Sequence, residues 1–169
     1  MRAFHFISAI VVFASCNQIN IQKETDAGIR QYENDSIVNA INTLSKVISK
    51  TDTCYACYLY RGFAYKKLKK YDNAIKDFTS LINLDKNDGV GFANRASVYY
   101  QMNDYLNSLR DFQRAFYLDT TQTILYHPIS HMLFATGQKD SACYYYFKSI
   151  ENGDTTFNQE IMNYCSKKE

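Results

Sequence analysis

The sequence predicts an all-α fold in which pairs of helices repeat along the chain and stack into a solenoid. Its 169 residues include one Pro and six Gly, a scarcity that is typical of helical proteins. Apolar residues recur at spacings of three and four, as they do on one face of a helix. Short stretches also resemble one another at a constant period of 34 residues. A single helix pair cannot bury such an apolar face alone, so successive pairs must stack.

Two columns of this repeat hold only small side chains. They are Gly28, Gly62, Ala96 and Ser130 in the first column, and Ala40, Ala74, Ser108 and Ala142 in the second. Large apolar residues occupy neighbouring columns, namely Leu44, Phe78, Phe112 and Tyr146, then Ile48, Ile82, Phe116 and Ile150, then Ile41, Ile75, Leu109 and Cys143. Small side chains let two helix axes approach, and large ones fill the adjacent groove. Each repeat is therefore expected to hold two packed helices of about 14 residues.

We expect four repeats, at residues 21–54, 55–88, 89–122 and 123–156, followed by a capping helix and tail at residues 157–169. Apolar residues in that last segment, among them Phe157 and Ile161, would cover the exposed face of the fourth repeat. Acidic residues mark the inter-helix turns, where they suit helix N-termini; they are Asp35, Asp72, Asp104 and Asp140. Pro128 falls near the start of the first helix of the fourth repeat, where we expect it either to be tolerated in the first turn or to shift the helix start.

The second repeat resembles a tetratricopeptide repeat (TPR) in residues that stand at the family's signature spacing. They are Tyr58, Gly62, Tyr65, Tyr71, Ala74, Phe78, Leu81 and Asp85. The third repeat continues the pattern with Phe92, Ala96, Tyr99, Tyr105, Ser108, Phe112, Ala115 and Asp119, whereas the fourth and first repeats match fewer positions. The family's closing Pro is absent from all four. The resemblance implies a right-handed α-solenoid that binds other proteins and is not an enzyme.

Arg61 and Arg95 share a column that is usually aliphatic. We expect each side chain to pack its stem along the helix and to pair its guanidinium with a carboxylate or a carbonyl.

The N-terminus has the pattern of an export signal. Arg2 precedes an apolar run at residues 3–14, which is too short to span a membrane. The residues Ala14, Ser15 and Cys16 resemble the end of a bacterial lipobox, although Phe13 replaces the usual Leu. This resemblance implies a signal peptide at residues 1–15, a lipid anchor on Cys16 and a short linker at residues 16–20. Ordinary secretion and a packed structural helix are the alternatives.

By the resemblance, the other face of each repeat's first helix lines a concave groove that binds a protein or peptide partner. Its predicted residues are Tyr32, Leu59, Phe63, Lys66, Lys67, Tyr100, Gln101, His127, His131 and Phe134. Apolar contact would hold the ligand, and the two lysines would bind an acidic group. Packing between neighbouring repeats is the alternative role for these aromatic residues. TPR domains that clamp a C-terminal carboxylate carry Lys and Asn where Leu59 and Phe63 stand here, which disfavours that ligand.

His127 and His131 are four residues apart on one helical face, a spacing that can hold a metal. The sequence lacks the HExxH signature and shows no third ligand nearby, so no metal or other cofactor is expected.

Four cysteines remain when Cys16 is set aside. Cys54 and Cys57 stand at the start of the second repeat, where a disulfide and two free thiols are equally favoured. A thioredoxin-like role would need a βαβ context, which the sequence does not show. Cys143 and Cys165 would meet if the capping helix packs on the second helix of the fourth repeat.

The net charge of +2, without a long basic run, gives nucleic-acid binding no support. The sequence therefore predicts a non-enzymatic scaffold in a bacterial cell envelope, held to the membrane by its lipid. The alternative is an envelope enzyme that uses Cys54 and Cys57 for redox chemistry, or His127 and His131 for metal chemistry. Self-association through the terminal repeats is a further prediction.

Overall fold

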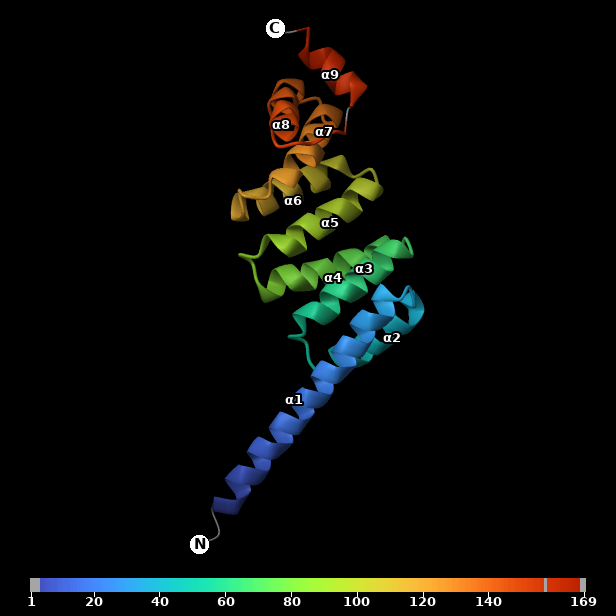
Figure 1. Cartoon of the computed structure of the whole chain (residues 1–169), viewed down its shortest axis with the longest axis vertical. Coiled ribbons are helices and arrows are strands. Elements are labelled where there is room, and N and C mark those ends of the chain that lie inside the picture. Colours follow the sequence, from blue (N-terminus) through green and yellow to red (C-terminus); the bar gives the residue numbers. More distant parts are fainter. Residues whose placement is uncertain (1–3, 157, 168–169) are drawn as a thin grey trace. The chain divides into compact units, whose positions relative to one another are not determined.

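The computed structural model describes the backbone of residues 4–156 and 158–167, and the side chains of residues 18–156 and 158–167. All regular secondary structure in these ranges is helical (Figure 1). The predicted all-α fold is confirmed. The chain divides into two compact parts, an N-terminal part (Met1–Asp77) and a C-terminal part (Phe78–Glu169), and each is described by itself.

In the N-terminal part, α1 (Phe4–Glu33) packs against α2 (Ile37–Ile48), and α3 (Tyr55–Lys67) contacts both. The next helix, α4 (Tyr71–Leu84), begins in this part and ends in the other. Leu44, Val47 and Cys57 are fully buried and form a core cluster. Gly28 brings α1 close to α2, because a Cβ there would lie 2.6 Å from Leu44 Cδ2. No described helix is both long enough and apolar enough to cross a membrane.

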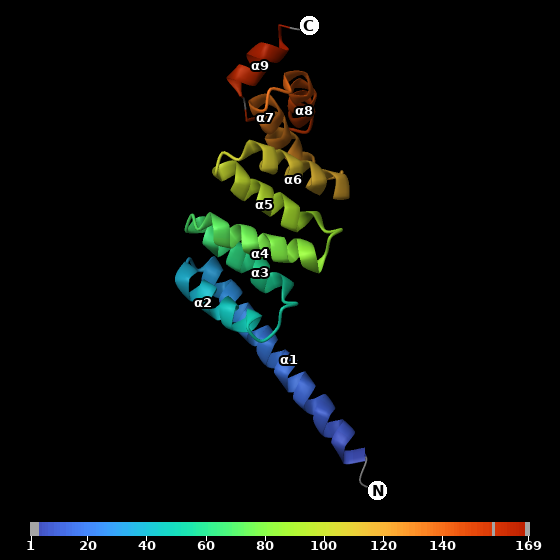
Figure 2. The ribbon, with the colours of Figure 1, turned by 180° about the vertical axis from the view of Figure 1, so that it is seen from behind.

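In the C-terminal part, α5 (Gly89–Gln101) pairs with α6 (Tyr105–Leu118), and α7 (Tyr126–Ala135) pairs with α8 (Lys139–Glu151). Figure 2 shows the two pairs from behind. A short 3₁₀ turn, η1 (Thr123–Leu125), leads into α7. Pro128 lies in the first turn of α7, and this helix also starts later in its repeat than α5 does, so both predicted alternatives hold. Phe112, Ile129 and Leu133 belong to the buried core of these pairs.

The two columns of small residues are buried in all four repeats. The alanines among them have no exposed surface, and neither does Ser108. The Ser108 hydroxyl donates a hydrogen bond of 2.9 Å to the Ala96 carbonyl, so one small residue contacts the other within the third repeat. Close approach of the two helices explains why these columns admit only Gly, Ala and Ser.

The turn between the helices of each repeat has one backbone conformation. Its characteristic residue has a positive φ, and the four are Asp35 (60°), Lys69 (57°), Asn103 (60°) and Gly137 (84°), again 34 positions apart. The N–H of the following residue bonds the carbonyl five positions back, as from Lys70 to Tyr65 at 2.9 Å. These bonds close the end of each first helix in a Schellman motif.

The acidic turn residues only partly meet the capping prediction. Asp104 is the N-cap of α6 and accepts a hydrogen bond from the Asn107 N–H at 3.2 Å. Asp72 and Asp140 lie in the first turns of α4 and α8. The prediction is wrong for Asp35, which adopts the left-handed turn conformation two positions before α2, where Ser36 is the N-cap. Asp tolerates that conformation better than most residues, which explains its presence there.

The predicted capping helix is α9 (Gln159–Cys165), which contacts α8. The carboxamide oxygen of Asn158 caps it by accepting from the N–H groups of Glu160 and Ile161, both at 3.1 Å. Ile161 and Cys165 are buried against Tyr146 of α8. Helix α9 thereby covers apolar surface that the fourth repeat would otherwise expose. Phe157 lies outside the described residues.

Both repeat arginines bind a carboxylate, as predicted. Arg61 donates from Nε and Nη2 to the two oxygens of Asp77, at 2.9 and 2.6 Å. Its third nitrogen, Nη1, donates to the Ser45 hydroxyl at 2.9 Å. In the C-terminal part, Arg95 makes the same bidentate pair with Asp111, and its Nη1 bonds Thr79. The guanidinium therefore ties together three helical segments in each case.

Candidate functional site

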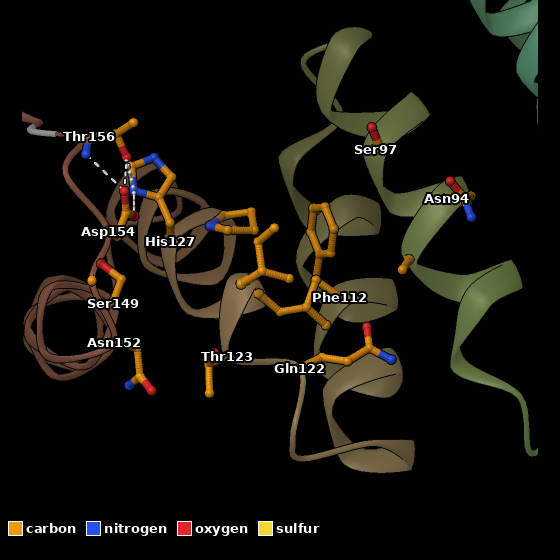
Figure 3. Close-up of a pocket in the computed structure, with 15 residues that line it drawn as sticks. Asn94, Ser97, Phe112, Gln122, Thr123, His127, Ser149, Asn152, Asp154 and Thr156 are labelled. Carbon is orange, nitrogen blue, oxygen red and sulfur yellow. Dashed lines mark hydrogen bonds and ion pairs between the residues drawn. The ribbon is translucent and has the colours of Figure 1, made fainter.

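A pocket of about 710 Å³ lies within the C-terminal part. Helices α5, α6, α7 and α8 line it together with η1 and the loop after α8. Its apolar surface includes Ala93, Phe112, Leu125 and Pro128, and its polar surface includes Asn94, Ser97, Gln122, His127, Asn152 and Asp154. Figure 3 shows His127 and Asp154 at one side and Asn94 and Ser97 of α5 at the other, with Phe112 between them.

A hydrogen-bonded network joins His127 to the loop after α8. His127 Nδ1 lies 2.9 Å from Asp154 Oδ2 and 3.1 Å from the Thr156 hydroxyl. Thr156 donates to Asp154 Oδ1 from its hydroxyl at 2.5 Å and from its backbone N–H at 2.8 Å. The hydrogen bonds from Thr156, and secondarily the adjacent His127, lower the pKa of Asp154 below its ordinary value. The loop therefore presents an ionised carboxylate at the wall of the pocket.

The same network fixes the tautomer of His127. An ionised carboxylate only accepts hydrogen bonds, so Nδ1 must carry the proton that faces Asp154. In the uncharged form of this tautomer, Nε2 carries no proton and can accept a hydrogen bond. This arrangement does not make a catalytic triad, because both Thr156 and Asp154 contact Nδ1. In a triad the nucleophile and the carboxylate bind opposite ring nitrogens.

Three carboxamides add further acceptors to the pocket. Asn94 and Asn152 each donate from Nδ2 to a backbone carbonyl four residues earlier, at 2.9 and 2.8 Å. Gln122 donates from Nε2 to the Asp119 carboxylate at 3.0 Å. Because these partners are acceptors only, they fix which end of each amide is the NH₂ group. The other end of each amide is therefore the carbonyl oxygen, which is an acceptor.

The other groove residues predicted in the C-terminal part lie apart from this network. His131 meets the ring of Tyr100 edge-on, with centroids 5.8 Å apart. Its Nδ1 is buried and has no hydrogen-bond partner in the described part of the chain. Phe134 packs edge-on against Tyr164 at 5.8 Å, so it contacts the capping helix. Gln101 is exposed. Of the ten predicted groove residues, His127 alone lines the pocket.

In the N-terminal part, the predicted aromatic residues form a cluster. The ring of Tyr32 lies 6.1 Å from Phe63, and Tyr60 approaches both rings, at 5.7 and 6.0 Å. The sequence prediction missed Tyr60, although its position three residues before Phe63 places it on a neighbouring face of α3. Leu59 is partly buried.

The two predicted groove lysines are less available than expected. Lys67 Nζ lies 2.7 Å from Asp35 Oδ1 in an exposed ion pair. Lys66 is partly buried, and burial lowers its pKa. An acidic ligand would have to displace Asp35 from Lys67, and Lys66 is partly withdrawn from the surface.

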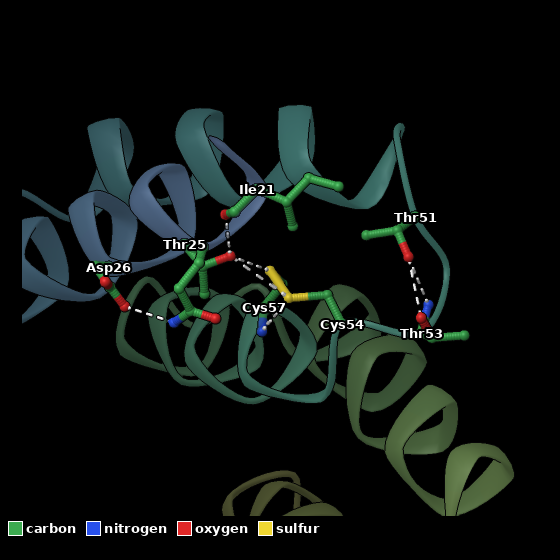
Figure 4. Close-up of a disulfide and its surroundings, with 8 residues drawn as sticks. Ile21, Thr25, Asp26, Thr51, Thr53, Cys54 and Cys57 are labelled. Atoms are coloured by element: carbon green, nitrogen blue, oxygen red, sulfur yellow. Dashed lines mark hydrogen bonds between the residues drawn. A yellow bond between two sulfur atoms is a disulfide. The ribbon is translucent and has the colours of Figure 1, made fainter. Parts of the chain in front are cut away.

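Both predicted cysteine pairs form disulfides in the structure. Cys54 and Cys57 are joined at the start of α3 with a Cα–Cα distance of 5.3 Å (Figure 4). Cys143 and Cys165 link α8 to α9 with a Cα–Cα distance of 5.6 Å. In the described ranges, no group of three His, Cys, Asp or Glu residues is placed to hold a metal ion.

Comparison with known proteins identifies the repeat. Residues 55–88 match the family model of the tetratricopeptide repeat. No protein with a curated description matches the sequence. The crystal structure of MamA protein is 20% identical, with a TM-score of 0.72 over 78% of this chain and 72% of that chain.

Two further TPR structures are similar to this chain. YrrB, a TPR protein with an unusual peptide-binding site, is 17% identical, with a TM-score of 0.70 over 77% of this chain and 67% of its own. The first TPR of Spaghetti (RPAP3), solved bound to the HSP90 peptide SRMEEVD, is 15% identical. Its TM-score is 0.66 over 69% of this chain and 93% of that chain. These similarities establish a TPR solenoid fold, as the sequence predicted.

Proposed function

We propose that the protein is a non-enzymatic interaction scaffold, and that the pocket of its C-terminal part binds a peptide segment carrying a basic side chain. The acceptor-rich wall around Asp154 is the observation that carries this proposal. TPR proteins of the same fold supply the ligand class, because Spaghetti was solved with a bound peptide and YrrB has a peptide-binding site.

The charge of the pocket favours a cation. Its described lining contains the ionised Asp154 and neither Lys nor Arg. Asn94, Gln122 and Asn152 add amide oxygens, which are hydrogen-bond acceptors, to this lining. An Arg or Lys head has only donors, and its aliphatic stem suits an apolar surface such as that of Phe112. An acidic peptide would instead place its charge beside the carboxylate of Asp154.

A peptide library displayed against the purified chain tests the proposal. Enrichment of Arg- or Lys-containing peptides is expected. Asp154→Asn should weaken the binding of these peptides about fivefold, since one charge-assisted contact is lost. Glu160→Gln removes an exposed charge from α9 and should leave binding unchanged. Enrichment of acidic peptides, or equal binding to Asp154→Asn, would overturn the assignment.

We further propose that the protein is exported and anchored in a bacterial cell envelope through a lipid on Cys16. The apolar run at residues 3–14 and the sequence Ala14-Ser15-Cys16 support this proposal. The side chain of Cys16 lies outside the described residues. Metabolic labelling with a fatty acid should mark the wild-type chain and Cys54→Ser, but not Cys16→Ser. Label on Cys16→Ser would contradict the anchor.

A further inference from the structure

The Cys54–Cys57 disulfide joins two cysteines with very different environments. Cys54 is the N-cap residue of α3 and is partly exposed, whereas Cys57 lies in the first turn of α3 and has no exposed surface. We propose that this disulfide is redox-active and exchanges with a dithiol, with Cys54 as the sulfur that is attacked. This inference goes beyond the scaffold function and does not depend on the pocket of the C-terminal part.

An incoming thiolate can reach one of the two sulfurs. A cleft of about 360 Å³ opens beside the disulfide, between the start of α3 and α1. Cys54 lines this cleft with Tyr55, Gln22 and Thr25, but Cys57 does not. Figure 4 shows Thr25 of α1 beside the bridge and the loop with Thr51 and Thr53 leading to Cys54. The cleft has room for a small thiol or for a cysteine in an extended peptide.

Polar groups beside the bridge favour the thiolates of the reduced pair, and for Cys57 they oppose the cost of burying a charge. The Cys57 N–H donates to Cys54 Sγ at 3.3 Å, and this bond would strengthen when Cys54 is ionised. Both sulfurs lie at the N-terminus of the 13-residue helix α3, where the helix dipole lowers thiol pKa values. The Thr25 hydroxyl lies 3.5 Å from Cys57 Sγ and 3.8 Å from Cys54 Sγ. It is buried and can turn its proton from the Ile21 carbonyl to a departing thiolate.

The exchange proceeds in two balanced steps. A thiolate of the partner dithiol attacks Cys54 Sγ, a mixed disulfide forms, and Cys57 leaves as a thiolate. The second thiolate of the partner then attacks the partner's own sulfur in the mixed disulfide and releases Cys54 as a thiolate. Two electrons pass to the cysteine pair, and the partner becomes a disulfide. The reverse steps oxidise the pair at the expense of a disulfide substrate. The described residues form helices and no βαβ unit, so the fold is not that of thioredoxin, but these steps do not need that fold.

The second disulfide provides a control within the same chain. Cys143–Cys165 joins two helices across 22 residues, and Cys165 is 2% exposed in a cluster with Tyr146 and Ile161. No helix N-terminus supports it, because Cys143 lies inside α8 and Cys165 ends α9. We expect this bridge to be structural.

The rates of reduction of the two bridges test the proposal without any substitution. The full chain is treated with dithiothreitol, sampled over time, alkylated and analysed by mass spectrometry. The Cys54–Cys57 bridge should be reduced at least about tenfold faster than Cys143–Cys165. Equal rates, or faster reduction of Cys143–Cys165, would overturn the proposal.

Single-cysteine variants identify the attacked sulfur. Glutathione disulfide should form a mixed disulfide with Cys54 in Cys57→Ser about tenfold faster than with Cys57 in Cys54→Ser. Thr25→Val should slow reduction of the wild-type bridge, and Thr25→Ser should restore the rate because it keeps the hydroxyl. A faster reaction at Cys57 contradicts the assignment of Cys54. An unchanged rate in Thr25→Val removes Thr25 from the mechanism.

Discussion

Arg95 and Asp111 form a bidentate ion pair in which Nε and Nη2 of the arginine donate to the two carboxylate oxygens at 2.7 and 3.0 Å. The Asp111 side chain is 3% exposed and that of Arg95 is 16% exposed. The two residues are 16 positions apart, as are Arg61 and Asp77 in the N-terminal part. The pair thus links α5 to α6 within one repeat by a charge contact rather than an apolar one.

Breaking this pair on one side should destabilise the C-terminal part strongly. Asp111→Leu leaves the Arg95 guanidinium without its carboxylate in a nearly buried site, which costs about 3–5 kcal/mol. The double variant Arg95→Leu and Asp111→Leu should lose much less than the sum of the single losses, because no unpaired charge remains. Urea denaturation of the wild type, Arg95→Leu, Asp111→Leu and the double variant measures the coupling energy between the two residues. Additive losses would show that the pair contributes no coupling energy.

Gly28→Ala should destabilise the N-terminal part by about 1–3 kcal/mol, the usual cost of overpacking a core. The added methyl group would lie 2.6–2.7 Å from two carbons of Leu44. The same substitution should cost less in a Leu44→Ala background, where the space is vacant. Thermal unfolding of the wild type, Gly28→Ala, Leu44→Ala and the double variant checks this expectation. An equal cost in both backgrounds would mean that Leu44 is not the obstacle.

Lys69→Gly should stabilise the turn between α3 and α4 by about 1 kcal/mol, since Lys69 is held at φ 57° and glycine adopts this conformation without steric cost. Gly137→Ala is the converse test. Its Cβ would meet no atom within 4 Å, so the expected loss of about 1 kcal/mol is purely conformational. Denaturant midpoints of both variants supply the measurement. Stabilisation by Gly137→Ala would argue against the left-handed turn.

The stability of the C-terminal part should fall as the pH drops below about 6.5, the ordinary pKa of histidine. Burial, followed by repulsion from the neighbouring His127, lowers the pKa of His131 in the folded chain, and Glu160 opposes this shift. The unfolded chain therefore binds the proton first, so acid favours unfolding until the folded pKa is also passed.

His131→Phe isolates this contribution, since it keeps an aromatic ring against Tyr100 and removes the buried nitrogen. Melting temperatures at pH 7.5, 6.5 and 5.5 should fall less for the variant than for the wild type. Parallel curves for the two proteins would contradict the prediction.

Much of the fold could be predicted because its signals are local. The small residues at Gly62 and Ala74 mark the close contact of two helices within one repeat. The resemblance to TPR proteins around Tyr58 and Phe78 then supplied the architecture. The cap at Asp35 failed as a prediction because residue type alone does not distinguish an N-cap from a left-handed turn residue.

The candidate site was predicted less well. His127 was identified from its position on a helix face, but its partners Asp154 and Thr156 were not. The closing Pro of the family is absent from the fourth repeat, and Asp154 stands in its place. The predicted lysine site differs from the structure because Lys67 is paired with Asp35. That pairing depends on how α1 and α3 pack, which the sequence does not show.

From the sequence we could predict the period of 34 residues, the two helices of each repeat and the residues that face between them, because helical periodicity couples positions three and four apart. The contact between His127 and Thr156, which are 29 residues apart, is visible only in the folded chain. The same is true of the cleft that Cys54 lines and of the burial of Cys57. Such contacts depend on packing angles and loop paths, and no local spacing in the sequence records them.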